Sequence, residues 1–176
     1  MARPCDHTSV GIVIWNDLDE LALIKRSNYP EAIALPAGHC DGDTFLEAAI
    51  REAQEETGLT PKNLVLRFAE RLDNPCKRED GLYHHWQVFE VVTWSGTLTA
   101  GSDAKEVFWV PRKQLYRYAH RTEYFMHKYQ ISCGDIGMLT HAIFGDPTLH
   151  NTDSEWKENP GLEPVWYFIL KSIRIL

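Results

Sequence analysis

Apolar and polar residues alternate along several short segments, which is the pattern of strands that bury one face. In residues 9–15 the side chains of Val10, Ile12 and Ile14 fall on one face. Residues 21–27 repeat the pattern after a turn-forming Asn-Asp-Leu-Asp tetrapeptide, so we expect the two segments to pair as a β-hairpin. Similar patterns predict strands at 64–72, 83–94 and 105–110.

The pattern changes to a helical period at residues 45–57. Thr44 and Glu47 have the spacing of a capping box, and Gly58 followed by Pro61 marks the end of the helix. After about residue 112 the sequence becomes helical again, with the clearest helices at 122–130 and 163–173 and a polar surface loop between them. Strands, a helix and further strands together predict an α+β fold with a mixed sheet.

The last predicted helix carries an apolar stripe at three- and four-residue spacing, formed by Leu162, Val165, Trp166, Ile169 and Ile173. Such a stripe must be buried, so we expect it to pack on the core or on a second copy of the chain. The charged residues nearby are expected to form a solvated face: Glu155, Lys157, Glu158 and Glu163.

Length and charge narrow the class of protein. The chain has 176 residues, which favours one domain, and its 18 basic and 25 acidic residues give a net charge of −7. An acidic chain has no global positive field for nucleic acid or anionic lipid. Four cysteines without CxxC spacing predict free thiols, and no apolar run is long enough to cross a membrane. We therefore expect a soluble cytoplasmic protein without a nucleic-acid or membrane partner.

The helix at 45–57 is unusually acidic on one side. At about 100° per residue, Glu52, Glu55 and Glu56 share a sector about 100° wide. The opposite sector holds an apolar stripe of Leu46, Ile50, Ala53 and Thr57. Glutamates on a helix usually form only a solvated face. Here, however, Arg51 can neutralise only part of the charge by reaching Glu47 or Glu55, which leaves room for a divalent cation. Carboxylate ligands favour Mg²⁺ or Mn²⁺ over zinc.

The surrounding segment, PAGHCDGDTFLEAAIREAQEETGL, resembles the Nudix box, whose pattern is G, five residues, E, seven residues and REUxEExGU, with U aliphatic. The resemblance extends over Ala37 to Leu59. It departs from the pattern at Asp43, which replaces the first Glu, at Ala53, which is small for its position, and at Ala37, which stands where a glycine is usual because the loop is one residue short.

The resemblance implies an α/β/α sandwich with a mixed sheet and a helical C-terminal addition, with residues 1–120 as the core and 121–176 as an extension packed on the core or at a dimer interface. It also implies a hydrolase in which divalent metal activates water to attack phosphorus in a nucleoside diphosphate derivative. By position, the metal ligands would be Glu52, Glu55, Glu56 and the carbonyl of Ala37. Arg51 would be catalytic with the three acids, and Glu52 is also a candidate base. A further acid is expected from Asp103 or Glu106.

Candidates for substrate binding are fewer and weaker. Arg26, Arg71 and Arg78 lie at strand ends or in a loop beside a strand, where they would bind phosphate or be merely solvated, and Tyr83 would stack on a base or pack in the core. Five residues are able to bind zinc but follow no zinc-finger spacing: Cys5, His7, Cys76, His84 and His85. His39 and Cys40 lie in the box loop itself.

Two other functions remain open at this point. An isomerase of the isopentenyl-diphosphate type shares the fold and needs a catalytic cysteine, for which Cys40 is the candidate. A non-enzymatic nucleotide-sensing Nudix domain would more often lose the box acids than keep them. The intact REAQEE sequence favours hydrolysis of a small nucleotide-type substrate.

Overall fold

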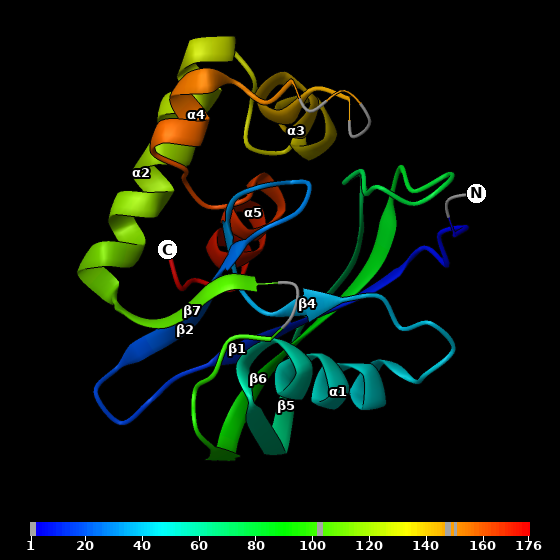
Figure 1. The fold of residues 1–176 in the computed structure, drawn as a ribbon, viewed down its shortest axis with the longest axis vertical. Helices are drawn as coiled ribbons and strands as arrows, with labels where there is room; N and C mark the ends of the chain where they lie inside the picture. The colour runs from blue at the N-terminus through cyan, green and yellow to red at the C-terminus, as the bar shows by residue number, and fades with distance from the viewer. Residues whose placement is uncertain (1–2, 102–103, 147–148, 150) are drawn as a thin grey trace.

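A computed structural model describes residues 3–101, 104–146, 149 and 151–176. Its strands form two sheets (Figure 1). The four-stranded sheet has the order β4 (Ala37–Gly38), β1 (Thr8–Ile14), β6 (His84–Gly96) and β5 (Leu59–Leu72). The three-stranded sheet has the order β3 (Ile33–Ala34), β2 (Glu20–Arg26) and β7 (Ala104–Pro111). Strands β1 and β6 are parallel and the other pairs are antiparallel, so the architecture is the expected α+β fold with a mixed sheet.

The predicted hairpin of the first two strands is wrong. β1 pairs with β4 and β6, whereas β2 pairs with β3 and β7, and the two strands share one bridge at Trp15 and Leu21. All residues of β1 from Ser9 to Ile14 are buried, which identifies a central strand with partners on both edges. Sequence neighbours with good strand patterns need not pair when each finds other partners.

In the part of the chain that the structure describes, five helices accompany the sheets: α1 (Phe45–Thr57), α2 (Arg112–Tyr129), α3 (Ile136–Phe144), α4 (Ser154–Glu158) and α5 (Pro164–Ser172). Helix α1 has the predicted bounds and α5 nearly so. Helix α2 begins at Arg112 rather than at residue 122, so it runs across the predicted border at residue 120, and the sequence pattern did not predict α3. Within the described ranges, none of the helices combines the length and apolarity that crossing a membrane requires.

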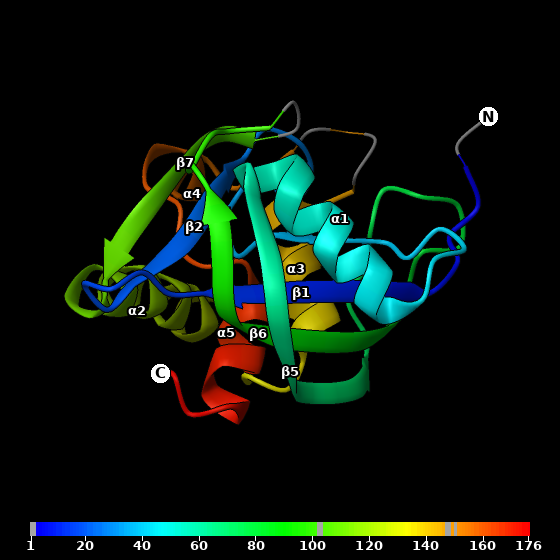
Figure 2. The ribbon, with the colours of Figure 1, turned by 90° about the horizontal axis from the view of Figure 1, so that it is seen from below.

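The helices cover opposite faces of the strands. In Figure 2, α1 lies over one face of β1, β5 and β6, and α3 and α5 lie behind the strands. The side chains of β1 serve both layers, because Val10, Ile12 and Ile14 join the cluster beneath α1 while Val13 joins the cluster that contains α5. The strands therefore form the middle layer of an α/β/α sandwich.

The apolar stripe of α5 is buried, as predicted, on the face opposite α1. Its five residues, Leu162, Val165, Trp166, Ile169 and Ile173, belong to one cluster with residues of the strands. Trp166 packs edge-to-face on Trp86, with ring centroids 5.6 Å apart. A Cβ at Gly11 would lie 2.2 Å from the Trp166 ring, so the absence of a side chain on β1 makes room for the indole.

Candidate active site

Helix α1 begins and ends at local capping signals. Thr44 and Glu47 form the predicted capping box, and Gly58 ends the helix with φ 71° and an N–H that donates to Gln54 O. The helix faces the strands with small residues, because its buried residues are Ala48, Ala49, Ala53 and Thr57.

The predicted apolar stripe of this helix is only partly correct. Leu46 is 47% exposed and Ile50 is half-buried, whereas alanines make the contact with the sheet. Because alanine allows a close approach, the inward face extends to include Glu52 and Glu56. These two acids line a cavity and do not belong to the apolar cluster of Ala48, Ala49 and Ala53, so the acids stay separate from the core, and the Glu55 side chain is 60% exposed.

The two inward carboxylates line a cavity of about 220 Å³. The carboxylate of Glu163 also lines the cavity, together with cationic side chains from other elements. The charged residues of the lining are Glu52, Glu56, Glu163, Arg26, Lys77 and Arg78. Acids that can hold metal and cations that can hold phosphate therefore share one cavity.

Strand β4 lies directly against the two acids. The Ala37 N–H donates to Glu56 Oε2 at 2.8 Å. A Cβ at Gly38 would lie 2.1 Å from the Glu52 carboxyl carbon, so only glycine leaves the Glu52 carboxylate in its place. In this chain the glycine stands one position later than in the usual pattern. The backbone of Ala37 therefore contacts Glu56, and the backbone of Gly38 lies against Glu52.

Arg51 donates hydrogen bonds to several of the acidic side chains around α1. It donates to Asp43 Oδ2 at 2.9 Å, to Glu52 Oε1 at 2.6 Å and to His39 O at 2.9 Å, and it reaches Glu55 Oε2 at 3.3 Å. The predicted contact with Glu55 is present, and Asp43 has a structural partner at the position where it replaces Glu. Burial raises the pKa of Glu52 above its usual value, and the hydrogen bond from Arg51 opposes this effect.

Of the predicted substrate-binding residues, Arg26 and Arg78 line the cavity. Arg26 Nη1 lies 3.5 Å from Glu163 Oε2, and Arg78 Nη2 donates to Asp41 Oδ2 at 2.9 Å. Both guanidinium groups are thus paired with a carboxylate at the edge of the cavity.

Arg71 and Tyr83 form a separate surface group. The guanidinium of Arg71 lies 4.2 Å from the Tyr83 ring centroid and pairs with Asp73 at 2.9 Å, and Tyr83 stacks on His7 with centroids 4.4 Å apart. Arg71 and Tyr83 therefore interact with each other and with their neighbours through cation–π, ion-pair and stacking contacts.

The comparisons with known proteins agree with this geometry. A family model described as the NUDIX domain matches residues 6–129. The chain belongs to the Nudix family. A curated relative, an ADP-ribose pyrophosphatase from Methanocaldococcus jannaschii, is 35% identical over 128 residues, which are 70% of this chain and 73% of that protein. The family and this homologue make the chain a Nudix-type hydrolase of phosphoanhydride bonds.

Solved structures show the same fold at lower identity. A MutT NUDIX hydrolase from Burkholderia pseudomallei has a TM-score of 0.52 at 21% identity, over 61% of this chain and 84% of that chain. The NUDIX domain of Shewanella oneidensis NrtR complexed with ADP ribose has a TM-score of 0.51 at 17% identity, over 66% of this chain and 78% of the other.

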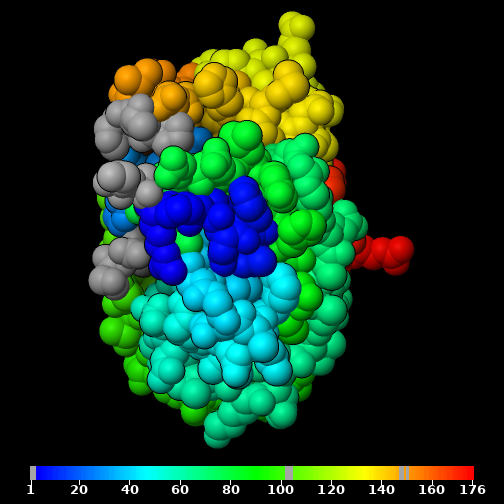
Figure 3. Space-filling view, turned by 90° about the vertical axis from the view of Figure 1, so that its right-hand side faces the viewer, coloured from blue at the N-terminus to red at the C-terminus, as the bar shows by residue number. Residues whose placement is uncertain are grey.

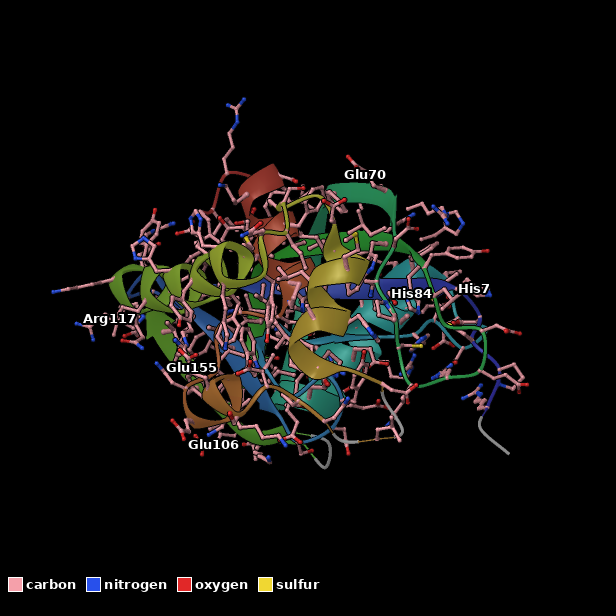
Figure 4. All side chains as sticks on the ribbon, turned by 90° about the horizontal axis from the view of Figure 1, so that it is seen from above. His7, Glu70, His84, Glu106, Arg117 and Glu155 are labelled. Carbon is pink, nitrogen blue, oxygen red and sulfur yellow. The ribbon has the colours of Figure 1, made fainter. Side chains whose placement is uncertain are left out.

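The additional acid of the Nudix site was predicted at two positions. Asp103 lies outside the described residues. Glu106 is exposed on β7 opposite Lys25, and Figure 4 shows it well away from His84, which lines the cavity.

Glu163 is a residue of the cavity that the sequence pattern did not predict. It was expected on a solvated face but is 7% exposed and lines the cavity, a correction to the predicted surface group. Burial raises the pKa of its carboxyl, and the charge of Arg26 opposes the shift. The available signal was its position between the apolar residues Leu162 and Val165, since a solvated face seldom interrupts an apolar stripe.

Proposed function

We propose that this Nudix hydrolase is a Mg²⁺- or Mn²⁺-dependent pyrophosphohydrolase that cleaves the diphosphate linkage of a nucleoside diphosphate sugar of the ADP-ribose type. The observation that carries the proposal is the cavity in which Glu52 and Glu56 face Arg26 and Arg78. A diphosphate needs both kinds of group, because cations bind its oxygens while carboxylates hold the metal that neutralises it. The relative named for ADP-ribose supports the substrate class.

The donor set fits a hard divalent cation. Glu52 and Glu56 offer carboxylate oxygens to one cavity, and oxygen ligands are those that Mg²⁺ and Mn²⁺ prefer. We assign Glu52, Glu56 and the Ala37 carbonyl as ligands, with Glu55 as the third carboxylate. The bound ion would neutralise the diphosphate and lower the pKa of water.

The other groups of the site bind and orient the substrate. Arg26 and Arg78 hold phosphate oxygens, for which the planar guanidinium is well suited. Glu52 accepts the proton of the attacking water, and Arg51 keeps that carboxylate in position through its 2.6 Å hydrogen bond. Attack on either phosphorus breaks the phosphoanhydride bond, so ADP-ribose would give AMP and ribose 5-phosphate.

A substrate panel tests the proposal. The full chain is incubated with Mg²⁺ and ADP-ribose, other nucleoside diphosphate sugars, nucleoside triphosphates or isopentenyl diphosphate, and the products are separated by ion-exchange chromatography. We expect a nucleoside monophosphate and a sugar phosphate from at least one diphosphate sugar. Turnover confined to triphosphates would contradict the substrate class.

The isomerase alternative is disfavoured by the position of Cys40. This residue is 4% exposed, belongs to the apolar cluster beneath α1, and has a thiol whose pKa is raised by burial. We therefore predict that Cys40→Ala keeps most of the hydrolytic rate, because attack by water needs no thiol. Near-total loss in a folded variant, together with isomerisation of isopentenyl diphosphate by the wild type, would favour the isomerase.

A further inference from the structure

A second cluster of ligating side chains lies beside the carboxylates and contains sulfur and nitrogen rather than oxygen. One ligand atom from each member lies within 4.8 Å of the others, and the members are Cys5, His39, Cys76 and His84. They come from four segments: the chain before β1, the loop after β4, the loop between β5 and β6, and the start of β6. Figure 3 shows the N-terminal segment between the box loop and the β5–β6 loop on one face of the molecule.

Four of the six distances between the ligand atoms lie within about 0.3 Å of the edges of a zinc tetrahedron, and the other two, from Cys76 Sγ to the two imidazoles, are within 4.8 Å. With Zn–S of about 2.3 Å and Zn–N of about 2.05 Å, such a tetrahedron has edges of about 3.8 Å for S–S, 3.5 Å for S–N and 3.3 Å for N–N. The Sγ atoms of Cys5 and Cys76 are 3.8 Å apart. Cys5 Sγ lies 3.5 Å from His39 Nε2 and 3.2 Å from His84 Nε2. The two Nε2 atoms are 3.2 Å apart.

Hydrogen bonds behind three of the four ligand atoms, those of His84, Cys5 and Cys76, suit them to metal binding. His84 Nδ1 lies 3.0 Å from the carbonyl oxygen of Asn74, and because a carbonyl only accepts, Nδ1 carries the proton and Nε2 presents its lone pair. Each sulfur also accepts a backbone N–H from the residue two positions later, His7 for Cys5 and Arg78 for Cys76, at 3.4 Å in both cases. Such donors stabilise the negative charge of a ligating thiolate.

We propose that Cys5, His39, Cys76 and His84 bind one Zn²⁺ ion in a closed, structural site in the wall of the same cavity, with ligands distinct from the carboxylates of α1. Two thiolates and two imidazoles suit zinc and not Mg²⁺, which prefers oxygen. Four protein ligands leave no open position, as in structural rather than catalytic zinc sites. The 3.8 Å between the sulfurs is far from the 2.05 Å or so of a disulfide bond.

The site would fix the cation-bearing wall of the cavity. Cys76 and His84 bracket the loop that carries Lys77 and Arg78, both of which line the cavity. The loop turns tightly at Gly81, where a Cβ would lie 2.2 Å from Cys76 Sγ. Zinc binding therefore ties this loop to the N-terminal segment and to the box loop, and it holds Arg78 beside the acids of α1.

The sequence named part of this cluster but not the set. Cys5, Cys76 and His84 were zinc candidates and His39 completes the group. His7 and His85 instead contact the Tyr83 ring. The ligands are separated by 34, 37 and 8 positions, so the fold, not a finger-like spacing, brings them together.

Metal content tests the proposal. The full chain is produced in zinc-supplemented medium, freed of any histidine tag, dialysed without chelator and measured by inductively coupled plasma mass spectrometry. We expect close to one zinc ion per chain, lost in Cys76→Ser and His84→Ala. The matched controls Cys133→Ser and His85→Ala should keep it, since neither residue belongs to the cluster. Equal loss in the controls, or a wild type without zinc, would overturn the proposal.

Spectroscopy on the wild-type protein tests the same zinc site without any variant, so it does not depend on whether the variants fold. Cobalt(II) exchanged into the protein should give the intense visible bands of a tetrahedral ion and a thiolate charge-transfer band. X-ray absorption at the zinc edge should show sulfur at about 2.3 Å and nitrogen at about 2.0–2.1 Å in equal numbers. A shell of oxygen alone, or a Cys5–Cys76 disulfide in the freshly purified protein, would overturn the site. Neither readout depends on hydrolytic activity, so failure here is distinct from failure of the proposed function.

Discussion

At the scale of single residues, Glu56 is the sharpest test of the carboxylate site. It faces the cavity and accepts the Ala37 N–H at 2.8 Å, a bond that an amide oxygen can also accept. We predict that Glu56→Gln lowers kcat by about a hundredfold or more, because a neutral side chain loses charge stabilisation in the transition state, while the fold persists. Steady-state kinetics and circular dichroism measure both.

The matched control for that variant is Glu47→Gln on the same helix. Glu47 accepts hydrogen bonds from Thr44 at the helix start, and glutamine also serves in a capping box. Its kcat should stay within about twofold of the wild type, since surface changes of this kind are usually small. Equal kinetics for the two variants would show that the acids of α1 are only structural.

A second prediction at this scale concerns Gly38 and rests on a steric clash instead of a change of charge. A Cβ there would overlap the Glu52 carboxylate, which is the end of a flexible side chain and can move aside. Gly38→Ala should therefore stay folded but lose at least about tenfold in kcat, since small misplacements of catalytic groups are costly. Gly134→Ala, where a Cβ meets nothing within 4 Å, should match the wild type. Normal turnover in Gly38→Ala would exclude Glu52 as ligand or base.

At the scale of elements, the sequence was most informative where the signals are local. Helix α1 was predicted with its correct bounds because Thr44, Glu47 and Gly58 act within one turn of its ends. Strand pairing was mispredicted because β1 and β2 find partners far along the chain. The start of α2 was missed because its first three residues are polar and its N-cap residue, Pro111, makes no side-chain capping hydrogen bond.

Helix α5 supports a prediction about stability. Removal of residues 160–176 would uncover the surface on which Leu162, Trp166 and three other apolar side chains are buried. Each such side chain contributes about 1.5–3 kcal/mol, so we expect aggregation or a marked fall in melting temperature. Size-exclusion chromatography and thermal unfolding measure this. A truncated chain that stayed soluble, monomeric and equally stable would show that the helix adds nothing to the core.

At the scale of the whole molecule, the sequence identified the acids of the site but not their surroundings. Glu52, Glu55 and Glu56 stood in one motif, so their chemistry was visible without a structure. The cavity itself is assembled from distant elements, and Glu163 reaches it from the position just before α5. The full cluster of Cys5, His39, Cys76 and His84 was not predicted for the same reason, because residue spacing along the chain does not show which distant segments meet in the fold.

The central claim is that the carboxylates of α1 serve a divalent metal in hydrolysis at phosphorus. The most direct test is ADP-ribose hydrolysis in ¹⁸O-water, first in excess EDTA and then with Mg²⁺ added above the chelator concentration. We expect no turnover in chelator, recovery with Mg²⁺ or Mn²⁺, and a single ¹⁸O on the phosphate of one product. Full activity in chelator, or label on a sugar carbon instead of phosphate, would contradict it.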